Sequence, residues 1–202
     1  MRIRRVGAEA LLLECADGAE VEAWRAELWR RRDGGDFAAT EIVPGARTVL
    51  LDGLDEPSVT ARLVESWGPP PAAGSAGGPL IEVPTAYDGP DLAEVADRWS
   101  MSVGEAVDLL AGAELRVAFC GFAPGFAYLT GLPGPDVPRL DTPRAQVPAG
   151  SVALAGPYAG IYPSASPGGW RLVGRTDLAL FDVDRDPPAL LTPGVRVRLA
   201  PA

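Results

Sequence analysis

The sequence of 202 residues predicts an α+β protein with two domains, a small N-terminal α/β sandwich and a larger domain built from short β-strands. Up to residue 67, segments in which apolar residues recur with the period of a strand are followed by segments with the period of a helix. This order is typical of a small α/β layer structure. A Gly/Pro-rich segment follows, and the rest of the chain breaks into short apolar runs separated by Pro and Gly. Apolar residues make up 47% of the chain, which is enough to fill a core in each domain.

The first domain, residues 1–67, is expected to run β-β-α-β-β-α. Its expected elements are, in order, strands at 2–6 and 11–15, a helix from 20 to 33, strands at 37–43 and 48–51, and a helix from 55. On the first helix Val21, Trp24 and Leu28 recur at spacings of three and four, and a Gly pair ends it. On the second helix the same spacing predicts that Val59, Leu63 and Trp67 share one face, which packs on the core.

Residues 68–79 form the expected linker, because they are almost entirely Gly, Pro, Ala and Ser and carry no apolar period. The second domain is therefore expected to span residues 80–202. Its expected elements are a strand at 80–84, helices at 91–99 and 102–111, and strands at 116–119, 151–155, 160–162, 170–175, 178–181 and 196–199. Many short strands with turn residues between them predict a barrel or a sandwich.

The two helices of the second domain have the spacing of a helix-turn-helix, with Ser102 and Glu105 forming a capping box. A DNA-reading helix needs basic residues, whereas the second helix carries Glu105 and Asp108 and no Arg. Two helices that cap a barrel are the favoured interpretation.

The net charge of −9 argues against nucleic acid and against anionic membrane surfaces as partners. No stretch approaches the roughly 20 apolar residues of a membrane span. The two cysteines, Cys15 and Cys120, form no disulfide framework and are expected to be reduced thiols of a cytoplasmic protein.

The chain contains no histidine. This excludes Ser-His-Asp and Cys-His catalysis within the chain, and no metal site is expected, because two cysteines cannot form a thiolate cage. Acid–base chemistry would require Asp, Glu, Tyr, Cys or a residue of a partner.

Three stretches carry side chains suited to binding. In the first, Phe122, Phe126 and Tyr128 stand on a Gly/Pro-shaped loop, either as core residues or as one wall of a groove. The second stretch brings arginines that bind carboxylate or phosphate, unless they pair with Asp136 or Asp141 at the surface. The polar residues of this second stretch are Arg139, Arg144, Gln146 and Ser151.

The third stretch contains Tyr162 and Trp170 around the turn at Pro167-Gly-Gly. Aromatic side chains with a polar end are common at interfaces and ligand sites, although a simple barrel turn would also contain them. Without a histidine base, Ser151 is expected to donate or accept hydrogen bonds rather than act as a nucleophile.

The order and the amino-acid sequences of these stretches resemble the motifs of one protein family. The motifs are Gly121-Phe-x-Pro-Gly-Phe-x-Tyr-Leu, Pro138-Arg-Leu-x-Thr-Pro-Arg-x-x-Val-Pro-Ala-Gly-Ser-Val-Ala, Gly160-Ile-Tyr-Pro-x-x-Ser-Pro-Gly-Gly-Trp and Leu172-x-Gly-Arg-Thr. They resemble the B subunit of 5-oxoprolinase, also called allophanate hydrolase subunit 1 or KipI-type kinase inhibitor. The resemblance implies a cyclophilin-like β-barrel for the second domain.

The resemblance also implies a heteromeric complex with a homologous C subunit and with an A subunit, which together open 5-oxoproline to glutamate with ATP. No cofactor is expected on this chain itself, and ATP is used by the complex. Two alternatives remain open: inhibition of a sensor histidine kinase, and a role in an allophanate hydrolase or a carboxyltransferase-type enzyme.

Ten matching positions are carried over from the resemblance as groove or interface candidates: Phe122, Pro124, Phe126, Tyr128, Arg139, Arg144, Ser151, Tyr162, Trp170 and Arg175. Of these, Arg144 or Arg175 is expected to hold the substrate carboxylate. Many relatives carry a His on the helix before the first motif, where this chain has Leu110; the position is either catalytic or a packing position.

Overall fold

The computed structural model describes residues 1–71 and 78–202, which fall into two compact units, Met1–Gly77 and Gly78–Ala202. Both units contain helices and strands, so the predicted α+β class is confirmed. Residues 72–77 of the expected linker lie outside the described residues. None of the helices in the described part of the chain is long and apolar enough to cross a membrane.

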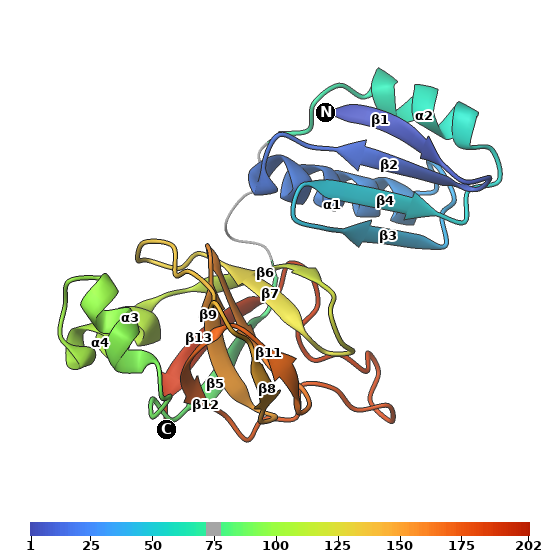
Figure 1. The fold of residues 1–202 in the computed structure, drawn as a ribbon. Helices are drawn as coiled ribbons and strands as arrows, with labels where there is room; N and C mark the ends of the chain where they lie inside the picture. Colours follow the sequence, from blue (N-terminus) through green and yellow to red (C-terminus); the bar gives the residue numbers. More distant parts are fainter. Residues whose placement is uncertain (72–77) are drawn as a thin grey trace. The chain divides into compact units, whose positions relative to one another are not determined.

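The first unit is a two-layer α/β sandwich with one antiparallel sheet in the order β1-β2-β4-β3 (Figure 1). Its elements are β1 (Arg2–Val6), β2 (Ala10–Glu14), α1 (Gly18–Asp33), β3 (Glu41–Pro44), β4 (Thr48–Asp52) and α2 (Pro57–Ser66). The Asp17 carboxylate caps α1 by accepting a hydrogen bond of 2.9 Å from the Glu20 amide. The last turn of α1 carries three arginines, residues 30–32. Their positive charges stabilise the helix, because the C-terminal end of its dipole is negative.

Buried and more exposed residues alternate along the two central strands of the sheet, and the buried ones form the core of this unit. Leu11 and Leu13 of β2 and Val49 and Leu51 of β4 are buried on one face of the sheet, while the residues between them are more exposed. Helices α1 and α2 cover that face and complete a single hydrophobic cluster.

The predicted inward face of α2 was wrong at Val59, whereas Trp67, also predicted on this face, is partly buried and packs against the core. Val59 is 45% exposed, and the helix buries Pro57, Thr60 and Val64 instead. Proline opens the helix at its first position, so the buried stripe begins there and continues at spacings of three and four. The third strand is also shorter than expected and begins at Glu41.

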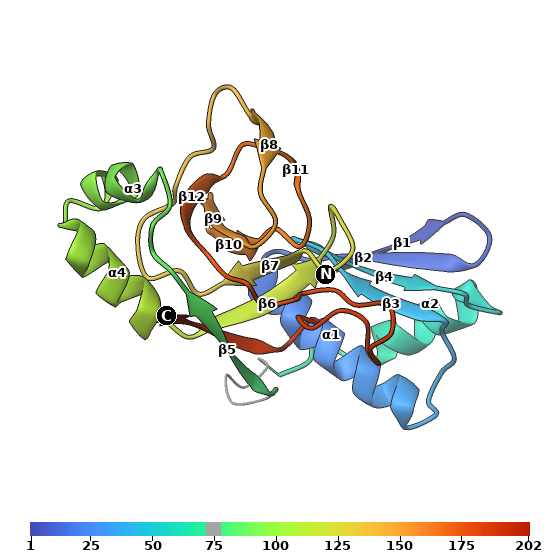
Figure 2. The same cartoon turned by 90° about the horizontal axis from the view of Figure 1, so that it is seen from below.

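The second unit is a barrel-like sheet of seven strands in the order β12-β9-β10-β7-β6-β13-β5 (Figure 2). Its strands are β5 (Leu80–Thr85), β6 (Leu115–Cys120), β7 (Ala127–Thr130), β9 (Ser151–Ala155), β10 (Tyr158–Ile161), β12 (Arg171–Arg175) and β13 (Arg196–Pro201). A separate two-stranded sheet joins β8 (Arg144–Val147) and β11 (Ser166–Gly168). The predicted choice between barrel and sandwich is therefore settled in favour of a nearly closed barrel.

Closure comes from the chain that follows β5. Ala86 and Arg175 exchange two backbone hydrogen bonds of 2.8 and 2.9 Å, which join the two ends of the sheet. The Asp91 amide then donates to the Leu172 carbonyl at 3.0 Å. This pairing brings the start of α3 (Leu92–Arg98) beside β12.

Helices α3 and α4 (Val103–Gly112) lie side by side against the barrel (Figure 1). The expected capping box is confirmed: the Ser102 amide donates to Glu105 at 2.8 Å, and the Glu105 amide donates to the Ser102 hydroxyl at 3.3 Å. Leu110 of α4 is fully buried in the barrel core. In this chain its position is therefore a packing position.

The strand predictions were wrong in one place and incomplete in three others. Residues 178–181 form no strand, because the chain folds back on a proline-rich segment and only Phe181 pairs, with Ala189. Proline has no amide hydrogen, so residues 187–188 cannot extend a ladder. Strands β7, β8 and β11, by contrast, were not expected, because each is three or four residues long and lies among Pro and Gly.

Candidate functional site

The main candidate site is a pocket of about 450 Å³ in the barrel unit, within the size range of small-molecule sites. Its walls come from β7 and the loop before it, from the 138–139 segment, from the β9–β10 turn and the residue after β10, and from β11 and the chain that follows it. The lining residues are Phe122, Phe126, Tyr128, Pro138, Arg139, Ala155, Gly156, Pro157, Tyr158, Tyr162, Pro167, Gly168 and Trp170.

Phe126 lies at the centre of the aromatic wall. Its ring centroid is 5.1 Å from that of Tyr128, 5.4 Å from that of Tyr162 and 5.4 Å from that of Trp170, and all three contacts are edge-on. Edge-to-face contacts place the positive rim of one ring on the negative face of the next, which stabilises a fixed arrangement. The wall is therefore a packed cluster rather than a set of independent side chains.

Two glycines allow the rings to approach the backbone. A Cβ atom at Gly160 would lie 2.9 Å from the Phe126 ring and 3.0 Å from the Trp170 ring. A Cβ atom at Gly168 would collide with the Tyr162 hydroxyl. Any larger residue at either position would have to displace an aromatic side chain of the wall.

Phe122 differs from the other rings because it is 63% exposed and has a φ of 71°. The Ala123 amide donates to the Gly121 carbonyl at 2.9 Å, which closes a three-residue γ-turn around Phe122. This turn type is rare for residues other than glycine and is strained. It holds the Phe122 ring edge-on to Phe126 and Tyr162, at 5.3 and 6.3 Å between centroids.

Arg139 is the cationic side chain of the pocket lining, and it is exposed. Among residues 1–71 and 78–202, no carboxylate pairs with it. Other arginines of the barrel unit are paired, as in Arg144–Asp91, Arg171–Glu94, Arg175–Asp88 and Arg198–Glu82. Arg139 therefore supplies a guanidinium that is available to an anionic ligand.

Tyr162 and Tyr158 bring phenol groups to the same pocket. Burial raises the pKa of Tyr162 above its usual 10, although the Trp170 backbone and the nearby charges of Arg139 and Arg144 act in the opposite direction. Burial, and to a lesser extent the neighbouring Tyr128, also raises the pKa of Tyr158. Both phenols are therefore neutral near pH 7 and can donate or accept hydrogen bonds.

The structure brings six of the ten sequence-predicted site residues to this pocket: Phe122, Phe126, Tyr128, Arg139, Tyr162 and Trp170. Of the others, Pro124 is exposed on the loop beside the pocket, and the Ser151 hydroxyl donates to the Pro148 carbonyl at 2.8 Å. Arg144 pairs with Asp91 at 2.7 Å, and Arg175 lies at the barrel closure paired with Asp88 at 2.9 Å. The surface pairing considered for Arg144 with Asp136 or Asp141 is thus replaced by a pair with a residue 53 positions away.

Sequence reasoning missed Tyr158, which packs edge-on against Tyr128 at 5.8 Å and against Phe119 at 5.5 Å. The available signal was Gly156-Pro157-Tyr158, a turn that is followed at once by an aromatic residue at the start of a strand. Pro138 and Pro167 were also missed as lining residues.

Neither cysteine lies in the lining of the pocket, and burial raises the pKa of both thiols to about 11. Among the described residues, no group of three or more His, Cys, Asp or Glu side chains is arranged to hold a metal ion. The pocket can bind and orient a small molecule with an apolar ring and a carboxylate, and its lining contains no carboxylate or thiolate base.

Comparison with known proteins places the chain in a family. Residues 1–191 match the family described as carboxyltransferase domain, subdomain C and D. A protein of Escherichia coli O157:H7, named as the B subunit of 5-oxoprolinase, is 43% identical over 168 residues, which cover 80% of this chain and 77% of that protein. A protein of the same name from Haemophilus influenzae is 34% identical over 207 residues, covering 98% of this chain and 96% of its own length.

Solved structures agree with the fold. TTHA0988 superposes with a TM-score of 0.77 at 33% identity; all of this chain is covered, but only 40% of the longer TTHA0988 chain. PH0987 from Pyrococcus horikoshii, of unassigned function, superposes with a TM-score of 0.59 at 32% identity, and 97% of it is covered. The urea carboxylase of Kluyveromyces lactis, at 19% identity and a TM-score of 0.70, shares the fold over 21% of its length.

The fold and these matches define a carboxyltransferase subdomain C and D protein. Within that class, the chain belongs to the family of the 5-oxoprolinase B subunit, as its sequence motifs predicted.

Proposed function

We propose that this chain is the B subunit of an ATP-dependent 5-oxoprolinase and that its barrel pocket binds 5-oxoproline. The observation that carries the proposal is an aromatic pocket whose lining includes Arg139, a guanidinium without a carboxylate partner in the described parts of the chain. 5-Oxoproline is a small lactam with one carboxylate: its carboxylate matches the guanidinium, and the CH2 groups of its ring can pack on the aromatic side chains. The names of the relatives from Escherichia coli and Haemophilus influenzae support the same substrate.

In this proposal the carboxylate of 5-oxoproline lies on Arg139, which can bind it through two parallel hydrogen bonds. The lactam ring packs against the rings of Phe126 and Trp170, and the neutral phenols of Tyr158 and Tyr162 donate hydrogen bonds to polar atoms of the lactam. Arg139 takes the place of Arg144 or Arg175 as the carboxylate ligand, because both of those guanidinium groups already pair with aspartates.

This chain has no histidine, and the lining of its pocket has no carboxylate. We therefore assign it binding and orientation, and assign the ATP-dependent step to its partners, an A subunit and a homologous C subunit. The exposed Phe122 and Pro124 beside the pocket fit a surface that such a partner covers.

A reconstitution experiment tests this role within the complex. This chain and the A and C subunits from the same genome are purified separately, and glutamate formation from 5-oxoproline is measured with and without ATP. Activity is expected only when all three proteins and ATP are present. Full activity of the A and C subunits without this chain would contradict the proposal, as would no activity of the complete mixture beside a working relative.

The family description favours one second candidate, a component of a carboxyltransferase-type enzyme. Such an enzyme moves a carboxyl group between a carrier and an acceptor. The same reconstituted mixture distinguishes the two when a carrier with a labelled carboxyl group is added, because a carboxyltransferase would move the label to an acceptor and would leave 5-oxoproline unchanged.

A further inference from the structure

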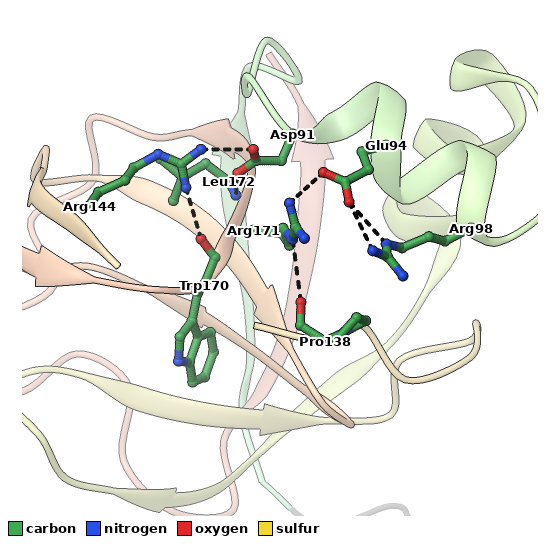
Figure 3. A network of polar contacts seen from close by, with 8 residues as sticks. All are labelled: Asp91, Glu94, Arg98, Pro138, Arg144, Trp170, Arg171 and Leu172. Atoms are coloured by element: carbon green, nitrogen blue, oxygen red, sulfur yellow. Dashed lines mark hydrogen bonds and ion pairs between the residues drawn. The ribbon is translucent and has the colours of Figure 1, made fainter. Parts of the chain in front are cut away.

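Helix α3 is tied to the pocket by a network of ion pairs that starts at Asp91, the residue before the helix (Figure 3). The Arg144 Nη2 atom donates to Asp91 Oδ1 at 2.7 Å, and the Leu172 amide donates to Asp91 Oδ2 at 2.7 Å. The Nη1 atom of the same Arg144 donates to the Trp170 carbonyl at 3.3 Å. Asp91 thus reaches the backbone of a pocket residue through one guanidinium.

A second tie begins one helical turn later, at Glu94. One carboxylate oxygen accepts hydrogen bonds from Arg98 at 3.0 and 3.2 Å, and the other pairs with Arg171. The Arg171 Nε atom donates to the Pro138 carbonyl at 3.3 Å. Pro138 lines the pocket and directly precedes Arg139.

Both ties end on backbone carbonyls of the pocket, and the view of this network shows the Trp170 indole pointing away from the ion pair (Figure 3). The indole forms part of the pocket wall. The network therefore lies behind the wall and does not itself contact the pocket space: the cavity lining includes neither Asp91, Glu94, Arg144 nor Arg171.

Stability alone is a weak reason for such a network. Asp91 is 8% exposed, and the side chains of Arg144 and Arg171 are 28% and 11% exposed, so all three lose part of their hydration. Desolvation offsets much of the attraction in such pairs, and apolar replacements are often equally stable. A guanidinium instead provides a fixed geometry, because its planar fork of donors holds two acceptors at defined positions.

We propose that Asp91 and Glu94 are positioning residues of the pocket. Through Arg144 and Arg171 they hold the carbonyls of Trp170 and Pro138, and they thereby fix the Trp170 wall and the placement of Arg139. Their charges also neutralise two arginines close to the pocket, so that the guanidinium of Arg139 dominates its electrostatics. Asp91 and Glu94 hold the Trp170 wall whatever the ligand is. An effect of these two residues on catalysis, by contrast, rests on the proposed function.

The first test reads the wall directly and needs no ligand. The full chain is labelled with 5-fluorotryptophan, and the Trp170 resonance is assigned by its loss in Trp170→Phe. Asp91→Asn places an amide where a carboxylate accepted two hydrogen bonds, so the Trp170 resonance should shift by more than its linewidth. The resonance of Trp24, in the other unit, should stay in place.

The matched control is Asp97→Asn, the same chemical change at an exposed position of the same helix. It should leave the Trp170 resonance unchanged. If Asp91→Asn does not fold, Arg144→Lys replaces it, because a single ammonium group cannot reproduce the fork that reaches both Asp91 and the Trp170 carbonyl. A Trp170 resonance that does not move in whichever of these two variants folds would overturn the proposal.

The second test uses the reconstituted complex. Asp91→Asn and Glu94→Gln should each raise the KM for 5-oxoproline about 3- to 10-fold, with a smaller change in kcat, and Asp97→Asn should change neither. Unchanged KM values with a shifted Trp170 resonance would overturn the effect on catalysis while leaving the wall geometry supported. If the wild-type complex shows no activity, the proposed function fails, and the resonance test still decides the positioning role.

Discussion

Phe122 combines two properties that rarely occur together, an exposed aromatic ring and a left-handed backbone conformation. A left-handed conformation costs an L-residue about 1–2 kcal/mol, and strain of this kind is common at functional sites. In this pocket the strain has a visible result, because the turn holds the ring at the edge of Phe126 and Tyr162.

Substitution of Phe122 separates the backbone strain from the role of the ring. Phe122→Gly removes both the ring and the strain, whereas Phe122→Ala removes the ring and keeps a Cβ atom. The glycine variant should be more stable than the alanine variant by about 1 kcal/mol in denaturant unfolding, the reverse of the usual order. Both variants should raise the KM for 5-oxoproline, because both lack the ring. An alanine variant more stable than the glycine variant would show that the backbone at residue 122 is not strained.

Gly168 tests the close packing of the aromatic wall. Gly168→Ala should destabilise the protein by about 1–3 kcal/mol, because its Cβ atom must displace the Tyr162 hydroxyl. Gly104→Ala is the control, since a Cβ atom there meets nothing within 4 Å and the residue lies in a helix. Thermal unfolding of the two variants should give opposite shifts, and a neutral Gly168→Ala would show that the wall tolerates rearrangement.

Residue types and motif order were sufficient to predict Arg139 and all the aromatic residues of the pocket lining except Tyr158. They were not sufficient to distinguish Arg139 from Arg144 and Arg175, because the carboxylates that pair with the latter two are distant in sequence. Asp91 is 53 residues from Arg144, and Asp88 is 87 residues from Arg175. The barrel closure brings these groups together, and no local pattern of the sequence contains that information.

At the scale of elements, α1 provides a pH-dependent stabilisation. The side chains of Arg30 and Arg31 donate hydrogen bonds to Glu27 at 2.7 Å and lower the pKa of its carboxyl group from the usual 4.5 to about 2. A depressed pKa in the folded state stabilises the protein above the unfolded pKa, and this contribution is lost as the pH falls through the folded pKa.

The expected result is a loss of stability of the wild type between about pH 4.5 and pH 2, and part of this loss should be absent in Glu27→Gln. Urea unfolding of both proteins at a series of pH values measures the difference. Parallel curves for the two proteins over this range would contradict the role of Glu27.

Elements with a full apolar period and clear end signals were predicted well from the sequence. Helix α1, which ends at the predicted pair of glycines, and helix α4, with its predicted capping box, are examples. The Asp17 cap of α1 was not predicted, and the helix begins two residues earlier than expected. The short strands β8 and β11 were not predicted, because three or four residues are too few to establish a period. Their pairing with each other depends on the loop geometry of the barrel and not on their own residues.

At the scale of the whole molecule, the barrel unit contains every lining residue of the pocket. Its lining combines aromatic rings with the guanidinium of Arg139, which suits the binding role proposed for it. The family match over residues 1–191 spans both units, so the two units are expected to serve one function.

The most direct measurement of the central claim is the KM for 5-oxoproline of the complex reconstituted with Arg139→Gln. The control is Arg198→Gln, an arginine of β13 that pairs with Glu82 and lies outside the pocket. A lost charged hydrogen bond costs about 1.5–3 kcal/mol, so Arg139→Gln should raise KM by about 10- to 100-fold while the control stays at the wild-type value. A KM unchanged by Arg139→Gln, in an active complex, would contradict the assignment of the substrate to this pocket.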